Sequence, residues 1–595
     1  MKAYSLFAIL LSLAATSKAA IDSSLPVAPT NIFETAVSVT PETKIDTLVN
    51  GQLKKLGVAP MLCSDEVFVR RIYLDVIGTL PSADEARTFL RDERLEKRRL
   101  LIDQLLARPE FADYWAMKWC DILRVKAEFP VNLWPNAAQA YHHWIKVSLR
   151  ENMPYDQFVR ELLTANGSNF RVGPVNFYRA VQNKTPEGIA AAVALTFMGT
   201  RVEAWTDKDQ LPGMAAFFSQ LSYKPTREWK EEIVYWDPNK EVQDATNAPP
   251  VRLYTTFRLP DGKRIKKIPE DKDPRELFAD WLITEKNPWF TMVLVNRQWG
   301  WLLGRGIIHE VDDIRPDNPP SNPKLLAYLQ KEFVNSRYDM KELMRLILNS
   351  RTYQTSSIVP RCAQLEKIEA NFGFYPLRRL DAEVLIDAIN RVTDTSDLYT
   401  SAIPEPFTFI PENTPAIALP DGSITSSFLE LFGRSARATG QATERVNKIS
   451  PTQKMHLLNS GHIQRKITTS PKIKKLLTGN AKKDTERFSE ILDEIYLMTL
   501  SRYPTPEERE TTRAYVKKGG AKGSDVWYDV IWALINSEEF LFRHKTGILE
   551  DGFSGNGAGL CAIGTQTRAP SADGILQHST FPVFQHSSEV IRRRV

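Results

Sequence analysis

Apolar positions recur at helical spacing along most of this 595-residue chain. The stretch SDEVFVRRIYLDVIGTLPSADEARTFL, residues 64–90, predicts a helix from Asp65, a break at Gly78 and a second helix after Ser82. Glu85 stands three residues after Ser82, the spacing of a capping box. A third amphipathic helix is expected over residues 96–107, so the first half of the chain is predicted to be all-α.

The pattern changes between Leu221 and Ile268, where β-branched and aromatic residues alternate with prolines. Asp261-Gly262 separates two short runs of β character, which predicts a hairpin. Helical periodicity resumes at Asp273. The predicted fold is therefore mainly α, with two multi-helix lobes and a small β-hairpin-containing insert between them.

Two stretches of the chain echo each other. LPSADE at residues 80–85, followed by LLARPEF, is similar to YPTPEE at residues 503–508, followed by ALINSEEF. In each stretch a Pro and a Ser or Thr cap start a helix, and a later helix ends near a Glu-Phe pair. The hypothesis is one helical unit used twice.

The N-terminal segment MKAYSLFAILLSLAATSKA has a basic start, an apolar run and small residues at Ser17 and Ala19. These features predict a secretory leader, so we expect a secreted or periplasmic protein. No later segment reaches the roughly 20 apolar residues of a membrane helix, so no transmembrane segment is expected. The predicted division is a signal peptide at 1–19, a flexible lead-in at 20–44, helical domains at 45–220 and 271–548, a β-containing insert at 221–270 and a disordered tail at 549–595.

The charge of the chain is nearly balanced. Lys and Arg number 77 against 72 Asp and Glu, a net +5, and removing Lys2 and Lys18 with the leader leaves +3. This balance indicates no nucleic-acid partner. The four cysteines, Cys63, Cys120, Cys362 and Cys561, allow three full pairings and favour none, although Cys120 beside Trp115 and Trp119 is expected to be a buried free thiol.

Residues 287–357 mix arginines, tryptophans and acids around a Pro-rich loop. The candidate surface or loop cluster comprises Arg297, Arg305, His309, Glu310, Asp312 and Asp313. Carboxylates and an imidazole can hold a divalent cation, but distant ligands are not identifiable. The favoured alternative is structural: the two aspartates accept loop hydrogen bonds or pair with Arg305 and Arg315, and the tryptophans pack in the core.

Other catalytic patterns are absent from the sequence. His142 and His143 point about 100° apart on a helix, so they cannot chelate one ion unaided. No nucleophile elbow, HExxH, Walker loop or dinucleotide GxGxxG occurs. The catalytic and metal-binding residues therefore stay unknown, and no cofactor is expected.

The segments FVRRIYLDVIGTLPSADEARTFL and LIDQLLARPEFADYWAMKWCDILR resemble domain of unknown function 1549. NPWFTMVLVNRQWGWLLGRGII, PPSNPKLLAYLQKEF, LRRLDAEVLIDAI and DVIWALINSEEFLFRH resemble its usual companion, domain of unknown function 1553. Such proteins are typical of planctomycetes, and many carry an added cytochrome-c-like domain. The resemblance implies a helical, exported protein with no established function.

The chain departs from that resemblance at two places. Many relatives follow a segment like Met198–Glu203 with CxxCHxHP, whereas this chain passes through Ala204 to Trp205. Relatives also often have a cysteine pair before a Glu-Arg, whereas this chain has Gln441 and Thr443 before Glu444-Arg445. Without thiols and an adjacent histidine, thioether attachment and ligation of haem are unavailable there.

These observations predict an envelope or periplasmic binding or structural protein whose partner is an unknown envelope protein or polysaccharide. One alternative is a secreted enzyme on polysaccharide or sulfated glycan, with Asp312 and Asp313 as candidate acids. Another is a redox protein, which the missing CxxCH disfavours.

Overall fold

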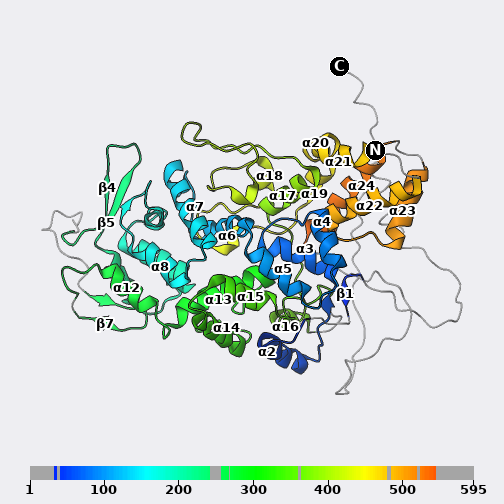
Figure 1. Ribbon diagram of the computed structural model, residues 1–595. Coiled ribbons are helices and arrows are strands. Elements are labelled where there is room, and N and C mark those ends of the chain that lie inside the picture. Colours follow the sequence, from blue (N-terminus) through cyan, green and yellow to red (C-terminus); the bar gives the residue numbers. More distant parts are fainter. Residues whose placement is uncertain are drawn as a thin grey trace, which may run out of the picture. The chain divides into compact units, whose positions relative to one another are not determined.

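The computed structural model describes residues 32–35, 40–240, 256–266, 268–359, 364–478, 484–518 and 523–543. The predicted leader, most of the lead-in, the tail after residue 549, Cys362 and Cys561 lie outside these residues. The described residues are mainly helical, as predicted (Figure 1).

Helices make up most of the first part of the chain. They are α2 (Lys44–Leu53), α3 (Asp65–Val76), α4 (Ala83–Arg91), α5 (Lys97–Leu106), α6 (Pro109–Ile122), α7 (Pro135–Arg150), α8 (Tyr155–Thr164), α9 (Asn176–Arg179), α10 (Pro186–Met198) and α11 (Gln210–Ala215). The predicted capping box at α4 is present, because Ser82 and Glu85 each accept from the other's backbone N–H.

The later part of the chain is built in the same way. Its helices are α12 (Pro274–Leu282), α13 (Pro288–Leu303), α14 (Pro323–Asn335), α15 (Met340–Leu348), α16 (Leu365–Ala370), α17 (Ala382–Thr393), α18 (Ser427–Leu431), α19 (Pro451–Asn459), α20 (Gly461–Thr469), α21 (Pro471–Thr478), α22 (Asp484–Leu500), α23 (Pro506–Lys518), α24 (Asp525–Ile535) and α25 (Glu538–Leu541). Proline opens many of them, where its missing N–H costs no hydrogen bond.

The strands form small antiparallel sheets. They are β1 (Glu34–Thr35) with β2 (Leu62–Cys63), β3 (Gly167–Ser168) with β5 (Glu232–Trp236) and β4 (Leu221–Pro225), and β6 (Phe257–Arg258) with β7 (Arg264–Ile265). The last pair encloses Asp261-Gly262, so the predicted hairpin is confirmed.

The expectation of an all-α first half is wrong in two respects, because β1 pairs with β2 and because β3 adds a third strand to the β4–β5 hairpin. Its register pairs Gly167 with Val234. Two residues cannot show an alternating pattern, so this strand has no signal in the sequence.

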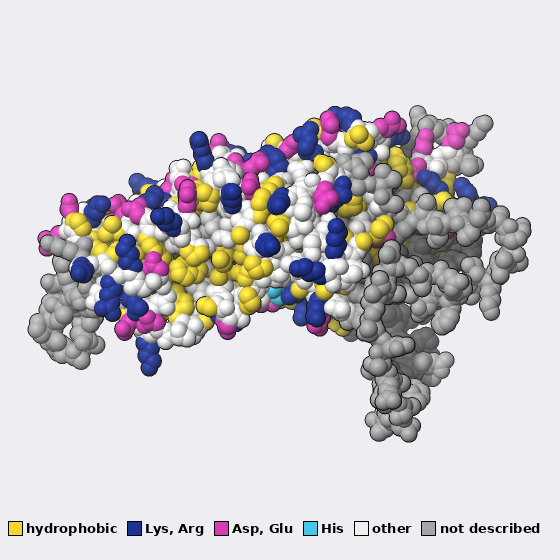
Figure 2. Space-filling model, turned by 90° about the horizontal axis from the view of Figure 1, so that it is seen from below, with side chains coloured by type: hydrophobic (Ala, Val, Ile, Leu, Met, Phe, Trp, Pro, Cys, Tyr) yellow, Lys and Arg dark blue, Asp and Glu magenta, His cyan; other side chains and the backbone are white. Residues whose placement is uncertain are grey.

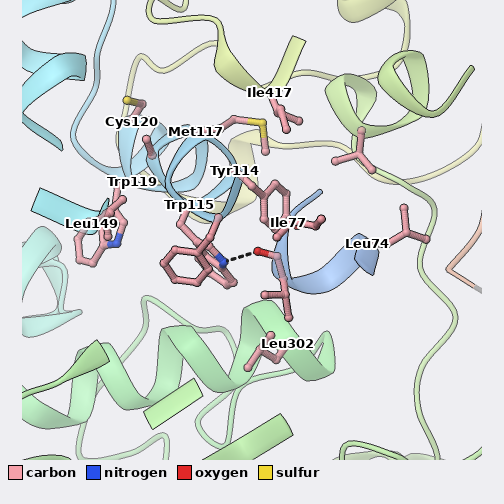
Figure 3. Packing of buried hydrophobic residues seen from close by; sticks show 14 of the residues in the cluster. Leu74, Ile77, Tyr114, Trp115, Met117, Trp119, Cys120, Leu149, Leu302 and Ile417 are labelled. Atoms are coloured by element: carbon pink, nitrogen blue, oxygen red, sulfur yellow. Dashed lines mark hydrogen bonds between the residues drawn. The ribbon is translucent and has the colours of Figure 1, made fainter. Parts of the chain in front are cut away.

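Tryptophans from the two halves of the chain meet in the core. Trp115 and Trp119 of α6 lie 5.6 and 6.0 Å from Trp301 of α13, measured between ring centroids. The indole N–H of Trp115 donates to the carbonyl of Val76 at 3.0 Å, the dashed line in Figure 3. Ring contacts between α6 and α13, and the indole hydrogen bond from α6 to α3, therefore join the three helices in one core.

Cys63 and Cys120 are free and buried. Burial raises the pKa of the Cys120 thiol to about 12, so the thiolate does not form near neutral pH. The predicted buried free thiol at Cys120 is confirmed.

The surface mixes charge types. Figure 2 shows basic and acidic side chains scattered among hydrophobic ones on the face seen from below, in keeping with the balanced composition. In the described part of the chain, no helix combines the length and apolarity needed to cross a bilayer.

The two echoing stretches form equivalent helical units, α3 to α6 and α22 to α25. Each has a capping box at its second helix, Ser82 with Glu85 and Thr505 with Glu508. Both units turn between the first two helices through a residue with positive φ, at +64° in Gly78 and +60° in Ser501. The structure therefore supports a duplicated unit.

Each unit also holds an arginine against a tyrosine and the capping-box glutamate. Arg108 lies 5.8 Å from the Tyr73 ring centroid and pairs with Glu85 at 2.7 Å. Arg502 lies 5.4 Å from the Tyr496 ring centroid and pairs with Glu508 at 2.7 Å. The two arginines occupy non-equivalent sequence positions yet make the same contacts.

Arg502 also pairs with Glu539 at 2.7 Å, and both side chains are at least 90% buried. Arg502→Met leaves the Glu539 carboxylate buried without a partner, so we expect the free energy of unfolding to fall by about 3 kcal/mol. Urea denaturation followed by tryptophan fluorescence measures this change. The matched control is Arg150→Met, which removes an exposed pair with Glu151 and should cost less than about 1 kcal/mol; equal losses in both variants contradict the prediction.

Candidate functional site

Arg297 is the buried anchor of the candidate region. It projects from α13, is fully inaccessible to solvent and donates to Asp312 at 2.8 Å. Its remaining N–H groups donate to the carbonyls of Leu195 and Thr196 in the last turn of α10. A cation at these carbonyls satisfies acceptors that the helix leaves open and complements the helix dipole.

The other members of the predicted cluster lie apart from this anchor. Asp313 pairs with Arg315 at 2.8 Å, and His309 contacts Glu310 at 3.1 Å on the surface. Arg305 is half-buried. Burial lowers the pKa of His309, against the opposing effect of Glu310. The predicted residues therefore divide between the buried Arg297–Asp312 pair and more exposed contacts. No group of three or more metal-capable side chains occurs among the residues that the structure describes.

The backbone just after α10 packs closely against the segment at Ile314. Gly199 ends the helix with φ +63°, and its carbonyl accepts the N–H of Ile314 at 2.8 Å. A β-carbon at Gly199 would lie 2.8 Å from the Ile314 side chain, so glycine is required. Beyond it runs the exposed short helix η3 (Val202–Ala204).

The loop of residues 433–447, here the Glu-Arg loop, meets this exposed segment. Arg201 donates to the side-chain oxygen of Gln441 at 3.2 Å, and the N–H of Ala442 donates to Asp312 at 3.2 Å. The two places where the chain departs from its resemblance therefore lie beside each other and beside Asp312.

Glu444 fixes the shape of the Glu-Arg loop. Its carboxylate accepts the N–H groups of Ala438 and Thr439 and the hydroxyl of Ser435, at 3.1, 2.6 and 3.2 Å. A carboxylate that gathers several donors from one loop holds them in a single conformation.

Arg445 ties the loop to two helices. It donates to Asp121 of α6 at 2.7 Å and to Glu383 of α17 at 2.5 Å. Burial raises the pKa of Glu383, but Arg445 and Arg434 outweigh burial and bring that pKa below its ordinary value. Arg437 adds a bond to Asp121 at 3.0 Å, so the ends of the loop are held by buried ion pairs.

The side chains at the meeting point do not fit a covalently attached haem. Arg201, Glu203, Gln441 and Thr443 present guanidinium, carboxylate, amide and hydroxyl groups. None is a thiol or an imidazole, the groups that attach and ligate haem iron. These exposed side chains can form hydrogen bonds with a polar partner, and the buried ion pairs of the Glu-Arg loop hold them in place.

His142 lies in the neighbouring helix α7 and is buried, whereas His143 is exposed. Burial lowers the pKa of His142 to about 3, and Arg437 lowers it further in the same direction. The imidazole is therefore neutral at pH 7 and is not paired with its neighbour.

The partners of Arg445 have no visible signal in the sequence. Glu444-Arg445 is visible as a pair, but Asp121 and Glu383 look like ordinary helix acids. Their burial is the missing information, because buried acids require cations. The spacing of Glu383 among apolar residues, in LDAEVLIDAI, is the one hint that it faces inward.

Comparison with known proteins gives two family matches. Residues 44–205 match the family described as PSCyt2, protein of unknown function (DUF1549). Residues 274–516 match the family described as PSD1, protein of unknown function (DUF1553). No curated protein and no solved structure matches the chain. The predicted domain pairing is confirmed.

Arg297→Met is expected to lower the free energy of unfolding by about 3 kcal/mol, because Asp312 stays buried without its cation. Replacing both partners, as Arg297→Met with Asp312→Leu, removes the stranded charge and should be less costly than the single change. Urea denaturation of the three proteins tests this order. A single change that costs less than the double one contradicts the buried ion pair.

Stability should also depend on His142. Its folded pKa of about 3 lies below the unfolded value of about 6.5, so its contribution is complete above pH 6.5 and is lost as pH falls toward 3. Between pH 6 and pH 5, His142→Leu should remove a slope of about 1.4 kcal/mol per pH unit. The exposed neighbour supplies the control, since His143→Leu should leave the profile unchanged; parallel profiles for all three proteins contradict the prediction.

Proposed function

We propose that this chain, which belongs to the proteins that pair the DUF1549 and DUF1553 families, is an exported binding protein of the cell envelope and not an electron carrier. Its partner in this proposal is an envelope protein or polysaccharide. The leader-like N-terminus supports export.

The observation that carries the proposal is the contact between Arg201 and Gln441. It joins the two segments at which many relatives are expected to carry cysteines. The buried frame around it consists of ion pairs, Arg297 with Asp312 and Arg445 with Asp121 and Glu383. Such a frame presents polar side chains in fixed positions, which suits recognition of a partner and offers no group for one-electron chemistry.

Both acids of the glycan-enzyme alternative are held in ion pairs. Asp312 is buried against Arg297, and Asp313 is paired with Arg315. A general acid or base must reach a substrate and titrate near the working pH. A binding role requires no such group.

The experiment uses the full chain, expressed with its leader in a bacterium that makes c-type cytochromes and purified from the envelope fraction. Absorption spectra are expected to lack a Soret band, and elemental analysis is expected to find less than about one transition-metal ion per ten chains. A stoichiometric haem or metal overturns the proposal, because it places cofactor chemistry in a site where no side chain supports it.

Binding is tested separately by sedimentation with isolated envelope material. The mature protein is expected to be retained on this material and released by competing soluble fragments of it. Failure of retention at low and at physiological salt contradicts the binding role even when no cofactor is found.

A further inference from the structure

Three segments that are distant in sequence enclose a cleft of about 580 Å³, here the hairpin cleft. They are the loop before α7, the loop between α9 and α10, and the turn between β4 and β5. The volume lies within the roughly 300–1,000 Å³ of small-molecule sites. The hairpin cleft is separate from the contact between Arg201 and Gln441, although Gln182 of its wall donates to the carbonyl of Ala438 in the Glu-Arg loop at 3.0 Å.

Aromatic rings stand exposed at the rim of the hairpin cleft. Trp229, at the tip of the β4–β5 turn, is 68% exposed, and its neighbour Lys230 lies 5.2 Å from the Trp229 ring centroid and 5.9 Å from that of Trp134. Trp134 in turn packs edge-on against Phe407 at 5.2 Å. Trp134 is half-buried, whereas an exposed tryptophan such as Trp229 is costly to leave in water and offers a flat apolar face to a ligand.

The acidic side chains of the cleft have polar partners, whereas several of its basic side chains have no ion pair. Its acids are engaged: Glu231 accepts from Ser168 and from Thr226, and Glu232 pairs with Arg179. The third acid, Glu228, is half exposed and lies 3.8 Å from Arg171. The cations Lys184, Arg227 and Lys230 form no ion pair within 4 Å in the part of the chain that the structure describes, although Lys184 lies over the Tyr223 ring. The unsatisfied charge of the hairpin cleft is therefore positive.

Arg179 supplies a buried polar group in the wall. Its side chain is 91% buried, and although its terminal nitrogen pairs with Glu232, its Nε has no hydrogen-bond partner among the described residues. A buried N–H without an acceptor is unfavourable, so the burial of this cation in the cleft wall is only partly compensated by Glu232.

We infer that the hairpin cleft binds an acidic oligosaccharide, with a sugar ring stacked on Trp229 and its anionic group held by Arg227 and Lys184. Sugar rings combine an apolar face with hydroxyl groups, which matches aromatic rings beside a polar wall. A sulfate ester or a uronate carboxylate supplies the negative charge. Single-stranded nucleic acid also stacks and carries charge, but a net charge of only +5 over 595 residues does not favour it. This inference rests on the proposed binding function and names its ligand class.

The test is calorimetric titration of the mature full chain with a chondroitin sulfate hexasaccharide, a galacturonate hexamer, neutral cellohexaose and a twelve-nucleotide thymidine strand. One or both acidic oligosaccharides are expected to bind at least tenfold more tightly than the other two, and which of them binds identifies sulfate or carboxylate as the anionic group. Tighter binding of cellohexaose or of the nucleotide strand overturns the inference.

Variants assign the binding to the hairpin cleft. Trp229→Ala should weaken it at least tenfold, Trp229→Phe should restore most of it, and Arg227→Gln should weaken it several-fold and reduce its salt dependence. Lys474→Gln removes the same charge from the exposed surface of α21 and should have no effect. Unchanged affinity in Trp229→Ala and Arg227→Gln overturns the inference.

The failures of the two proposals are distinguishable. Retention on envelope material without binding of either acidic oligosaccharide overturns the inference alone. Loss of retention overturns the proposed function.

Discussion

The arrangement of the candidate region depends on one buried cation, Arg445. Its side chain is 94% buried, and its guanidinium binds Asp121 from α6 and Glu383 from α17. Removing a charge from water costs several kcal/mol, so the position persists only because both carboxylates are in place. Since Asp121 lies in the segment matched to DUF1549 and Arg445 in the segment matched to DUF1553, this interaction binds the two family segments together.

A series of hydrogen bonds connects the position of Arg445 to the rest of the candidate region. Glu444, its neighbour, gathers the amides of the Glu-Arg loop and so presents Gln441 to Arg201 and the N–H of Ala442 to Asp312. Asp312 is held by Arg297, which also closes the last turn of α10. The exposed side chains contribute little energy to this frame, because surface hydrogen bonds compete with water. Exposed positions can therefore change without disturbing the fold, which explains how the chain retains both family matches while its exposed side chains depart from the resemblance.

Local features of the sequence predict much of the fold. Ser82 with Glu85 predicts the start of α4, and Asp261-Gly262 predicts the β6–β7 hairpin, because capping and turn formation involve neighbouring residues. The contacts of the candidate cluster could not be predicted in the same way, because proximity in sequence does not decide which charged side chains pair. Asp312 pairs with Arg297 of the preceding helix and accepts from a loop more than a hundred residues later. The duplicated unit makes the same point, because Arg108 and Arg502 reach equivalent places from non-equivalent positions.

The distribution of paired and unpaired charge separates structural from recognition roles. Buried cations such as Arg297 and Arg445 are paired with carboxylates, so their charges are neutralised within the protein. At the hairpin cleft the acids are matched while Lys184 and Arg227 are not, and Trp229 stays exposed. Folding alone favours neither an exposed tryptophan nor unpaired cations at a cleft. The hairpin cleft therefore combines an exposed tryptophan with unpaired cations, whereas Arg297 and Asp312 of the predicted cluster belong to the buried frame.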